Sequence, residues 1–171
     1  MLHNGDSAVL KVLYSTYASY LTGVCTRYLS DLDDVKDVLH DSFLKIFASV
    51  RMFEYRGKGS LKAWLTRIVV NESLKFIRRA YRLDFVSVSQ EQIEIEAEEP
   101  ELDGISMAEL HRMICELPPG YRTVFNLYVF EEKSHKEIAE ILDIKESTSA
   151  SQLHRAKALL ATKIRNYQSH S

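Results

Sequence analysis

The sequence predicts an all-α protein made of two small helical domains joined by an acidic linker. Apolar residues recur at intervals of three and four along most of the chain, which is the repeat of an amphipathic helix and not of a strand. Only 6 glycines and 3 prolines interrupt the 171 residues. The charged residues are unevenly distributed, so that one strongly acidic segment separates two mildly basic ones.

The acidic segment defines the expected domain boundaries. Residues 1–82 carry 13 basic and 8 acidic side chains, whereas residues 83–109 carry 9 acidic and no basic ones. Residues 110–171 carry 9 basic and 7 acidic side chains. The strip "SQEQIEIEAEEPELDG" cannot easily bury itself and its charges repel one another, which favours an extended linker. We therefore predict domains at residues 1–82 and 105–171, with residues 83–104 between them.

Seven helices are expected from the apolar spacing, with no pair of strands and no internal repeat. No apolar run approaches the roughly 18 residues of a membrane span, and the N-terminus lacks the pattern of a signal peptide. We therefore expect a cytoplasmic protein without membrane insertion. Cys25 and Cys115 have no CxxC partner, so we expect no metal ion and no cofactor. The expected helices cover roughly residues 7–29, 32–50, 60–82, 105–116, 119–130, 135–142 and 148–166.

The second expected helix, in "DLDDVKDVLHDSFLKIF", is acidic on one side. Asp34, Asp37 and Asp41 share a face, and the other side is mainly apolar. An acidic face in a basic domain is a poor surface for DNA but suits the docking of a basic protein partner. Ordinary solvation of the charges is the alternative interpretation.

The third expected helix, in "FEYRGKGSLKAWLTRIVVNESLKFIRRAYR", carries a basic stripe that contains no acid. Ser60 is the expected N-cap after the glycine loop. A cationic track beside aromatic rings is typical of a surface that binds single-stranded nucleic acid. Trp64 is equally compatible with a place in the core and with ligand contact. The stripe falls within an arc of about 80° at the helical repeat and comprises Ser60, Trp64, Arg67, Asn71, Lys75, Arg78 and Arg82.

The stretch "KSHKEIAEILDIKESTSASQLHRAK" predicts a helix-turn-helix. Ser134 and Glu137 form a capping box, Asp143 tolerates the left-handed backbone of the corner, and Ser147 is the expected second N-cap. The second helix presents polar residues away from its apolar face, which could read the major groove or contact phosphates. A plain helical hairpin with a solvated face is the alternative. Ser151, His154 and Arg155 point away from the apolar face, and Thr148 and Gln152 lie on its flank.

These stretches, in this order, resemble the extracytoplasmic-function group of bacterial sigma factors. "DDVKDVLHDSFLKIF" and "YRGKGSLKAWLTRIVVN" resemble the family's region 2. "LPPGYRTVFNLYVFEEKSHKEIAEILDIKESTSASQLHRAK" resembles its region 4. The combination of W-L-x-R-I-x-x-N with L-P-x-x-x-R and E-I-A is specific, whereas either half alone would be weak. The matches cover most of residues 12–165 and are interrupted only at the acidic strip.

The resemblance implies a dissociable subunit of RNA polymerase that needs no catalytic residues of its own. Residues 1–82 would bind the clamp helices of the core enzyme and the melted minus-ten strand, with one base flipped into a pocket near Asn71. The polymerase-binding residues would be Asp34, Asp37, His40 and Asp41. The minus-ten residues would be Tyr55, Arg56, Lys58, Ser60, Lys62, Trp64, Arg67, Asn71, Lys75 and Arg78.

Residues 105–171 would hold the minus-thirty-five duplex and touch the polymerase flap through an apolar surface near residues 127–130. The minus-thirty-five residues would be Thr148, Ser151, Gln152, His154 and Arg155. The resemblance also implies an anti-sigma protein as a further partner, although no residue identifies one.

Several positions depart from the family pattern. Lys75 stands where an acid is frequent, which is expected to strengthen the basic stripe. Ser149 replaces a usual Val on the core-facing side, so the core is expected to be short of one apolar side chain there. Ala150 and Gln152 stand where basic residues are frequent, which would lower the affinity for the minus-thirty-five element or change its sequence.

Two other classes of protein are compatible with parts of the pattern. A free-standing helix-turn-helix regulator with a sensing N-terminal domain would need a ligand pocket and would not need the basic stripe. A metal-dependent nuclease would need carboxylates that converge on a cavity, whereas the acids at 31–41 line one helix face.

Overall fold

The computed structural model of the chain describes residues 4–81, 102 and 104–170. All the regular structure in these ranges is helical, which confirms the expected fold class. The chain divides into two compact units, Met1–Ala80 and Tyr81–Ser171. Except for residues 102 and 104, the expected linker at 83–104 lies outside the described residues, and so does Arg82. None of the described helices is long and apolar enough to cross a membrane.

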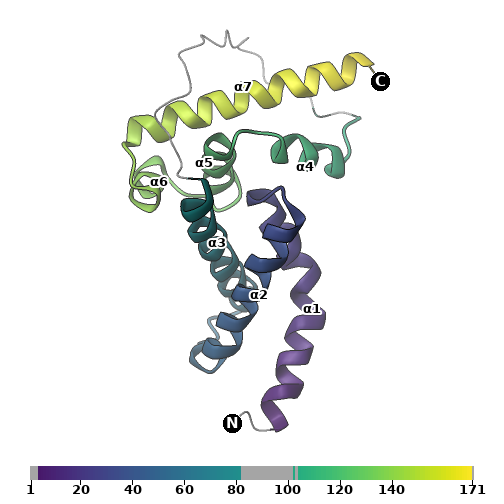
Figure 1. The fold of residues 1–171 in the computed structure, drawn as a ribbon, viewed down its shortest axis with the longest axis vertical. Helices are drawn as coiled ribbons and strands as arrows, with labels where there is room; N and C mark the ends of the chain where they lie inside the picture. Colours follow the sequence, from purple (N-terminus) through teal and green to yellow (C-terminus); the bar gives the residue numbers. More distant parts are fainter. Residues whose placement is uncertain (1–3, 82–101, 103, 171) are drawn as a thin grey trace. The chain divides into compact units, whose positions relative to one another are not determined.

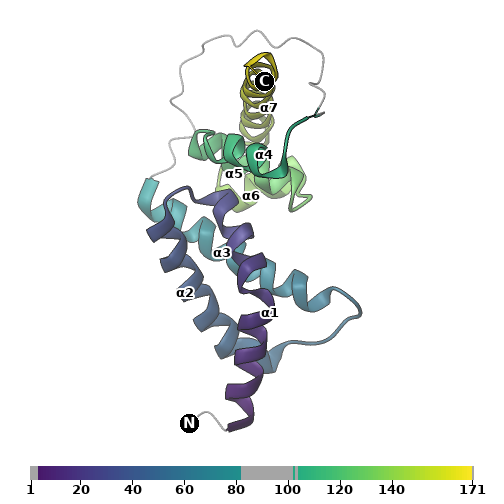
Figure 2. The ribbon, with the colours of Figure 1, turned by 90° about the vertical axis from the view of Figure 1, so that its right-hand side faces the viewer.

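The first unit consists of three α-helices and one turn of 3-10 helix (Figure 1). These are α1 (Asn4–Tyr28), α2 (Leu32–Ser49), η1 (Val50–Met52) and α3 (Ser60–Tyr81). Figures 1 and 2 both show α2 running back alongside α1, and the two helices are in direct contact. Each of the three helices buries its periodic apolar residues, and the fully buried ones include Leu21, Val24, Tyr28, Ile46, Leu65, Val69 and Ile77.

The start of α2 is fixed by Asp31. Its side-chain oxygen accepts hydrogen bonds from the backbone N–H groups of Asp33 and Asp34, at 2.8 and 3.1 Å. These bonds satisfy two of the donors that a helix leaves unpaired at its N-terminus. The cap also fixes the angular position of every later residue of α2, including the acidic face.

Cys25 lies in the core of the first unit and is fully buried. Burial raises the pKa of its thiol to about 11, and the hydrogen bond from Ser73 only partly opposes this shift. The thiol is therefore protonated at neutral pH, which makes it a packing residue and not a nucleophile.

The second unit is organised around α7 (Glu146–His170), which contacts all three other helices of the unit (Figure 1). The others are α4 (Met107–Cys115), α5 (Pro119–Val129) and α6 (His135–Leu142). Pro119 opens α5 at a position where its missing N–H costs nothing. The main hydrophobic cluster comprises Met113, Ile114, Leu117, Tyr121, Ala156, Leu160 and Ile164.

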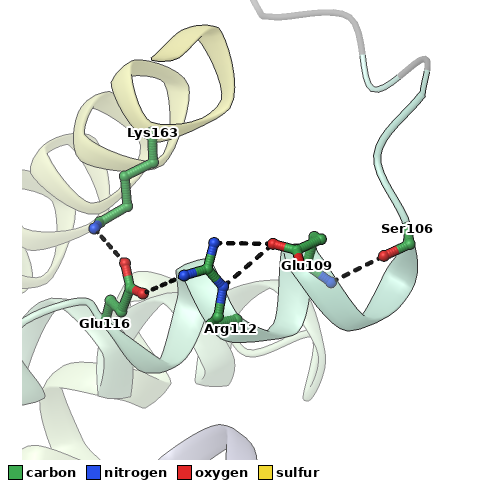
Figure 3. Close-up of polar contacts among 5 residues, drawn as sticks. All are labelled: Ser106, Glu109, Arg112, Glu116 and Lys163. Carbon is green, nitrogen blue, oxygen red and sulfur yellow. Dashed lines mark hydrogen bonds and ion pairs between the residues drawn. The ribbon is translucent and has the colours of Figure 1, made fainter. Parts of the chain in front are cut away.

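A chain of polar contacts fastens α4 to the C-terminal half of α7 (Figure 3). Ser106 caps α4 by accepting from the Glu109 N–H at 3.2 Å, and Arg112 pairs with Glu109 at 2.9 Å and with Glu116 at 3.4 Å. Glu116 then pairs with Lys163 of α7 at 2.6 Å, which lowers the pKa of Glu116. These groups are partly exposed, so each pair contributes little stability and acts mainly to align the helices.

The helix-turn-helix has the expected capping box and corner. The Ser134 hydroxyl accepts from the Glu137 N–H at 3.2 Å, while the Glu137 carboxylate accepts from the Ser134 N–H at 2.8 Å. Asp143 is in the left-handed conformation, with φ 55° and ψ 51°. The expected cap at Ser147 is wrong: α7 begins at Glu146, because the Ser149 N–H already bonds the Lys145 carbonyl at 3.1 Å.

Replacing Ser134 by alanine is expected to destabilise the second unit by about 1 kcal/mol, since one helix donor loses its partner. The hydrogen bonds from Ser134 hold the pKa of Glu137 below its usual value. The contribution of Glu137 is therefore present above its unfolded-state pKa and is lost as the pH falls through the lowered one. Thermal unfolding followed by circular dichroism at neutral and acidic pH measures both effects. An equal loss at both pH values would contradict the reciprocal cap.

Candidate nucleic-acid interfaces

The outer face of α3 presents a free cationic edge. Arg67, Asn71 and Arg78 are exposed, and none of them pairs with another residue in the described part of the chain. The charges of Arg67 and Arg78 are therefore available to an anionic ligand without breaking an internal ion pair, and the Asn71 amide lies between them. This edge is the centre of the stripe expected from the sequence.

The glycine loop before α3 carries further exposed groups. Tyr55 is 73% exposed, Lys58 is also exposed, and Arg56 pairs with Glu54 at 3.2 Å. Gly57 and Gly59 have φ angles of +107° and +89°, which side-chain-bearing residues rarely adopt. The loop therefore presents an aromatic ring and cations on a backbone that only glycines build at low cost.

Ser60 closes the loop and is not the N-cap of α3. It is the first residue of the helix, and the Gly59 carbonyl already accepts from the Ala63 N–H at 2.9 Å. The Ser60 hydroxyl donates to the Gly57 carbonyl at 2.7 Å and accepts from the Arg56 N–H at 3.2 Å. The expected cap is therefore wrong by one residue, and Ser60 positions the loop.

Trp64 and Lys62 are engaged with other parts of the first unit. The half-buried Trp64 ring packs on Phe53, with ring centroids 5.3 Å apart. The Lys62 ammonium lies 4.1 Å from the ring centroid of Tyr20 on α1. Both contacts hold the start of α3 against its neighbours, and Trp64 stays partly exposed.

Lys75 does not add a free positive charge to the stripe, contrary to the expectation from the sequence. Its ammonium lies 3.8 Å from a carboxylate oxygen of Glu72, whose side chain is only 7% exposed. Glu72 also pairs with Lys45 of α2, which joins the two helices. The Lys75 ammonium is therefore directed toward Glu72, one turn earlier on α3, and not free in the stripe.

The acidic side of α2 borders a hollow between α2 and α3. Asp37, His40 and Asp41 are exposed and line it, whereas Asp34 is half-buried and does not. Glu72 and Arg79 line the same hollow, and neither was predicted from the sequence. The sequence signal for Arg79 was the doublet Arg78-Arg79. Consecutive residues of a helix point about 100° apart, so the second arginine lies on a different face from the first.

The N-terminal part of α7 presents a smaller polar surface than expected. Ser151 and His154 are exposed, and Thr148 and Arg155 are half-buried. Gln152 is wrong as an exposed reading residue, because its side chain is only 4% exposed. Its side-chain oxygen is buried as well.

Ser149 does not leave an unfilled core position. It is fully buried, and its hydroxyl lies 2.9 Å from Nδ1 of His135 at the start of α6. The His135 ring stacks on Tyr128 of α5, with centroids 4.9 Å apart. A polar contact thus takes the place of the apolar one expected from the family pattern, and it links both helices of the helix-turn-helix.

The apolar surface at the end of α5 is narrower than expected from residues 127–130. Leu127 is 1% exposed and belongs to the core. Tyr128, Val129 and Phe130 are 39%, 43% and 41% exposed. These three residues form the part that a protein partner can reach.

Two family models match the chain. The model for Sigma-70 region 2 matches residues 13–83, and the model for Sigma-70, region 4 matches residues 107–160. The ECF RNA polymerase sigma-E factor of Haemophilus influenzae is 30% identical over 176 residues, which cover 95% of this chain and 91% of the relative. This chain belongs to the ECF group of RNA polymerase sigma factors.

A second relative is similar over most of its length, and a solved structure shares the fold. The sigma factor is 29% identical to the ECF RNA polymerase sigma factor SigW of Bacillus subtilis over 175 residues, covering 95% of this chain and 92% of SigW. It shares the fold of the sigma factor RpoE of Bartonella quintana, which was solved in complex with the anti-sigma factor NepR. That likeness has a TM-score of 0.52 at 21% identity and covers 91% of this chain and 96% of RpoE.

Proposed function

We propose that this alternative sigma factor binds core RNA polymerase and directs initiation at promoters that it recognises at two elements. The first domain, residues 1–82, binds the melted minus-ten strand and the polymerase clamp. The second domain, residues 105–171, binds the minus-thirty-five duplex, and residues 83–104 are the linker between the two domains. The observation that carries the proposal is the division of charge in the first unit. Free cations lie on the outer edge of α3, and exposed acids lie on α2. A single-stranded ligand and a protein partner thus have separate surfaces.

The proposed minus-ten surface has the groups that strand capture requires. Unstacking one base costs a few kcal/mol, and contact of a base with an aromatic ring or pocket returns about 1–3 kcal/mol. The exposed Tyr55 and the half-buried Trp64 offer such rings, and Asn71 offers an amide that can pair with a base edge. Arg67 and Arg78 supply phosphate contacts that offset the rest of the free energy needed to unstack the base.

The proposed minus-thirty-five surface is the start of α7. Ser151 and His154 are exposed there, and Thr148 and Arg155 flank them. Hydroxyl groups and backbone N–H groups at a helix start suit phosphates, while His154 and Arg155 can reach base edges or phosphates. Because Gln152 is buried, we omit it from this surface. Tyr128, Val129 and Phe130 are the proposed contact with the polymerase flap.

The alternative of a free-standing regulator is not favoured. The matches to sigma region 2 and region 4 together cover most of the chain, including the N-terminal part that a regulator would use for sensing. Sigma factors are transcription initiation factors and not enzymes, so the polymerase supplies the chemistry. An anti-sigma protein stays a prediction from family membership.

Run-off transcription with purified core polymerase and genomic fragments tests the proposal. We expect the full chain to produce discrete transcripts that start at defined sites and share two upstream sequence elements. Core polymerase alone is the control. The absence of any chain-dependent start site across the genome would contradict the proposal.

A further inference from the structure

The hollow between α2 and α3 has charges of both signs around it. Its volume is about 310 Å³, and Val38 and Phe76 supply its apolar part. We call it the α2–α3 hollow. Its lining residues are Asp37, Val38, His40, Asp41, Glu72, Lys75, Phe76 and Arg79.

The charges at the α2–α3 hollow fall into two groups. Glu72 is buried and pairs with Lys45 of α2 and with Lys75 of α3, so its charge is already matched and the Lys45–Glu72 pair joins the two helices. Asp37, Asp41 and Arg79 are exposed and make no ion pair with any described residue, including one another. Opposite charges that line one hollow without pairing can each interact with a partner.

We propose that α3 forms part of the polymerase-docking surface, through Arg79, and that the polymerase segment seated here carries both basic and acidic side chains. The proposal rests on the docking of α2 to core polymerase proposed above. Basic groups of that segment face Asp37 and Asp41, and an acidic group faces Arg79. Facing charges of opposite sign stabilise an interface and fix its register, whereas facing charges of like sign repel and weaken it.

The proposal divides two neighbouring arginines between two ligands. Arg79 lines the α2–α3 hollow, whereas Arg78 does not and belongs to the outer edge of α3. The two residues are of the same type, are both exposed and are adjacent in the chain, so they form a matched pair. If polymerase affinity depends only on the net charge of the chain, the same substitution at either arginine changes it equally. If the affinity depends on the α2–α3 hollow, only the substitution at Arg79 changes it.

Charge reversal at Arg79 distinguishes a polymerase segment with charges of both signs from a uniformly basic one. The two kinds of segment predict opposite changes in affinity. A uniformly basic segment would bind more tightly to Arg79→Glu, which adds negative charge to the surface. A segment with an acid opposite Arg79 would bind about tenfold more weakly, since two like charges then face each other. We expect the weaker binding.

The experiment measures the affinity of the fluorescently labelled full chain for purified core polymerase by anisotropy. Arg79→Glu and the milder Arg79→Gln are compared with Arg78→Glu, and circular dichroism confirms that each variant is folded. Weaker binding of both Arg79 variants, with Arg78→Glu close to wild type, supports the proposal. Unchanged or tighter binding of Arg79→Glu overturns it, and so does an equal loss in Arg78→Glu. If the wild-type chain does not bind at all, the proposed function fails instead.

Discussion

Replacing Arg67 and Arg78 together by alanine is expected to slow promoter opening by about 100-fold, because this removes two charge-assisted hydrogen bonds worth about 1.5 kcal/mol each. Both side chains are exposed on α3 and pair with nothing in the described ranges. Their removal therefore leaves no internal charge unsatisfied, and the fold should be unaffected. Affinity for core polymerase should also be unchanged, since neither residue lines the α2–α3 hollow.

The rate of opening can be followed by the fluorescence of a base analogue in the minus-ten element of a promoter found by run-off transcription. For binding of the single strand, the plot of log K against log[salt] should be less steep by about 1.4 in the double variant. Each arginine that no longer neutralises a phosphate reduces the steepness by about 0.7. Lys11→Ala is the control, because it removes an exposed cation of the first unit that lies on α1 and outside the stripe. Loss of polymerase binding in the double variant would reverse the assignment of the two faces.

The helices of this sigma factor are predictable because their signals are local. The apolar repeat locates all seven, the capping box at Ser134 gives the start of α6, and Asp143 gives its end. Each signal lies within a few residues of the feature that it predicts. The errors at Ser60 and Ser147 have a local cause too, since a serine near a helix start can bond the loop as readily as it caps the helix.

The contacts between helices were not predictable, because they join residues far apart in the chain. Glu72 and Lys45 are 27 positions apart, so their pairing across α2 and α3 has no local signal. Lys75 also pairs with Glu72, three positions away on α3, although the helical repeat placed Lys75 in the stripe. A helical wheel gives the direction of a Cα–Cβ bond, but the end of a lysine can bend to either side. The burial of Gln152 is a second case, because the wheel placed it on the flank of the apolar face.

Ser149 shows how a polar residue in the core can be misjudged from one helix alone. The sequence indicates a missing apolar side chain at this position, but the compensating group is His135, which is 14 positions earlier. Neither residue predicts the contact by itself. The pair also accounts for the place of the histidine, whose ring lies between Ser149 and Tyr128 and brings α5, α6 and α7 together.

Replacing Ser149 by alanine is expected to destabilise the second unit by about 2 kcal/mol, because a ring nitrogen beside the buried hydroxyl loses its hydrogen-bond partner. His135→Leu should be destabilising for the same reason, since it leaves the Ser149 hydroxyl without that bond. The double variant His135→Leu with Ser149→Val replaces both groups by apolar ones, which can be nearly neutral when the shape is kept. The two single changes should therefore be strongly non-additive.

A double-mutant cycle on the unfolding of the full chain measures this coupling. The chain has one tryptophan, Trp64, and it lies in the first unit. Tryptophan fluorescence therefore follows the first unit and serves as an internal control, while circular dichroism follows both units. Additive effects would show that His135 and Ser149 act independently. The pair could also set the angle between α6 and α7. In that case each single variant should lose affinity for the minus-thirty-five duplex. The double variant should regain that affinity, because α6 and α7 again pack through a matched contact.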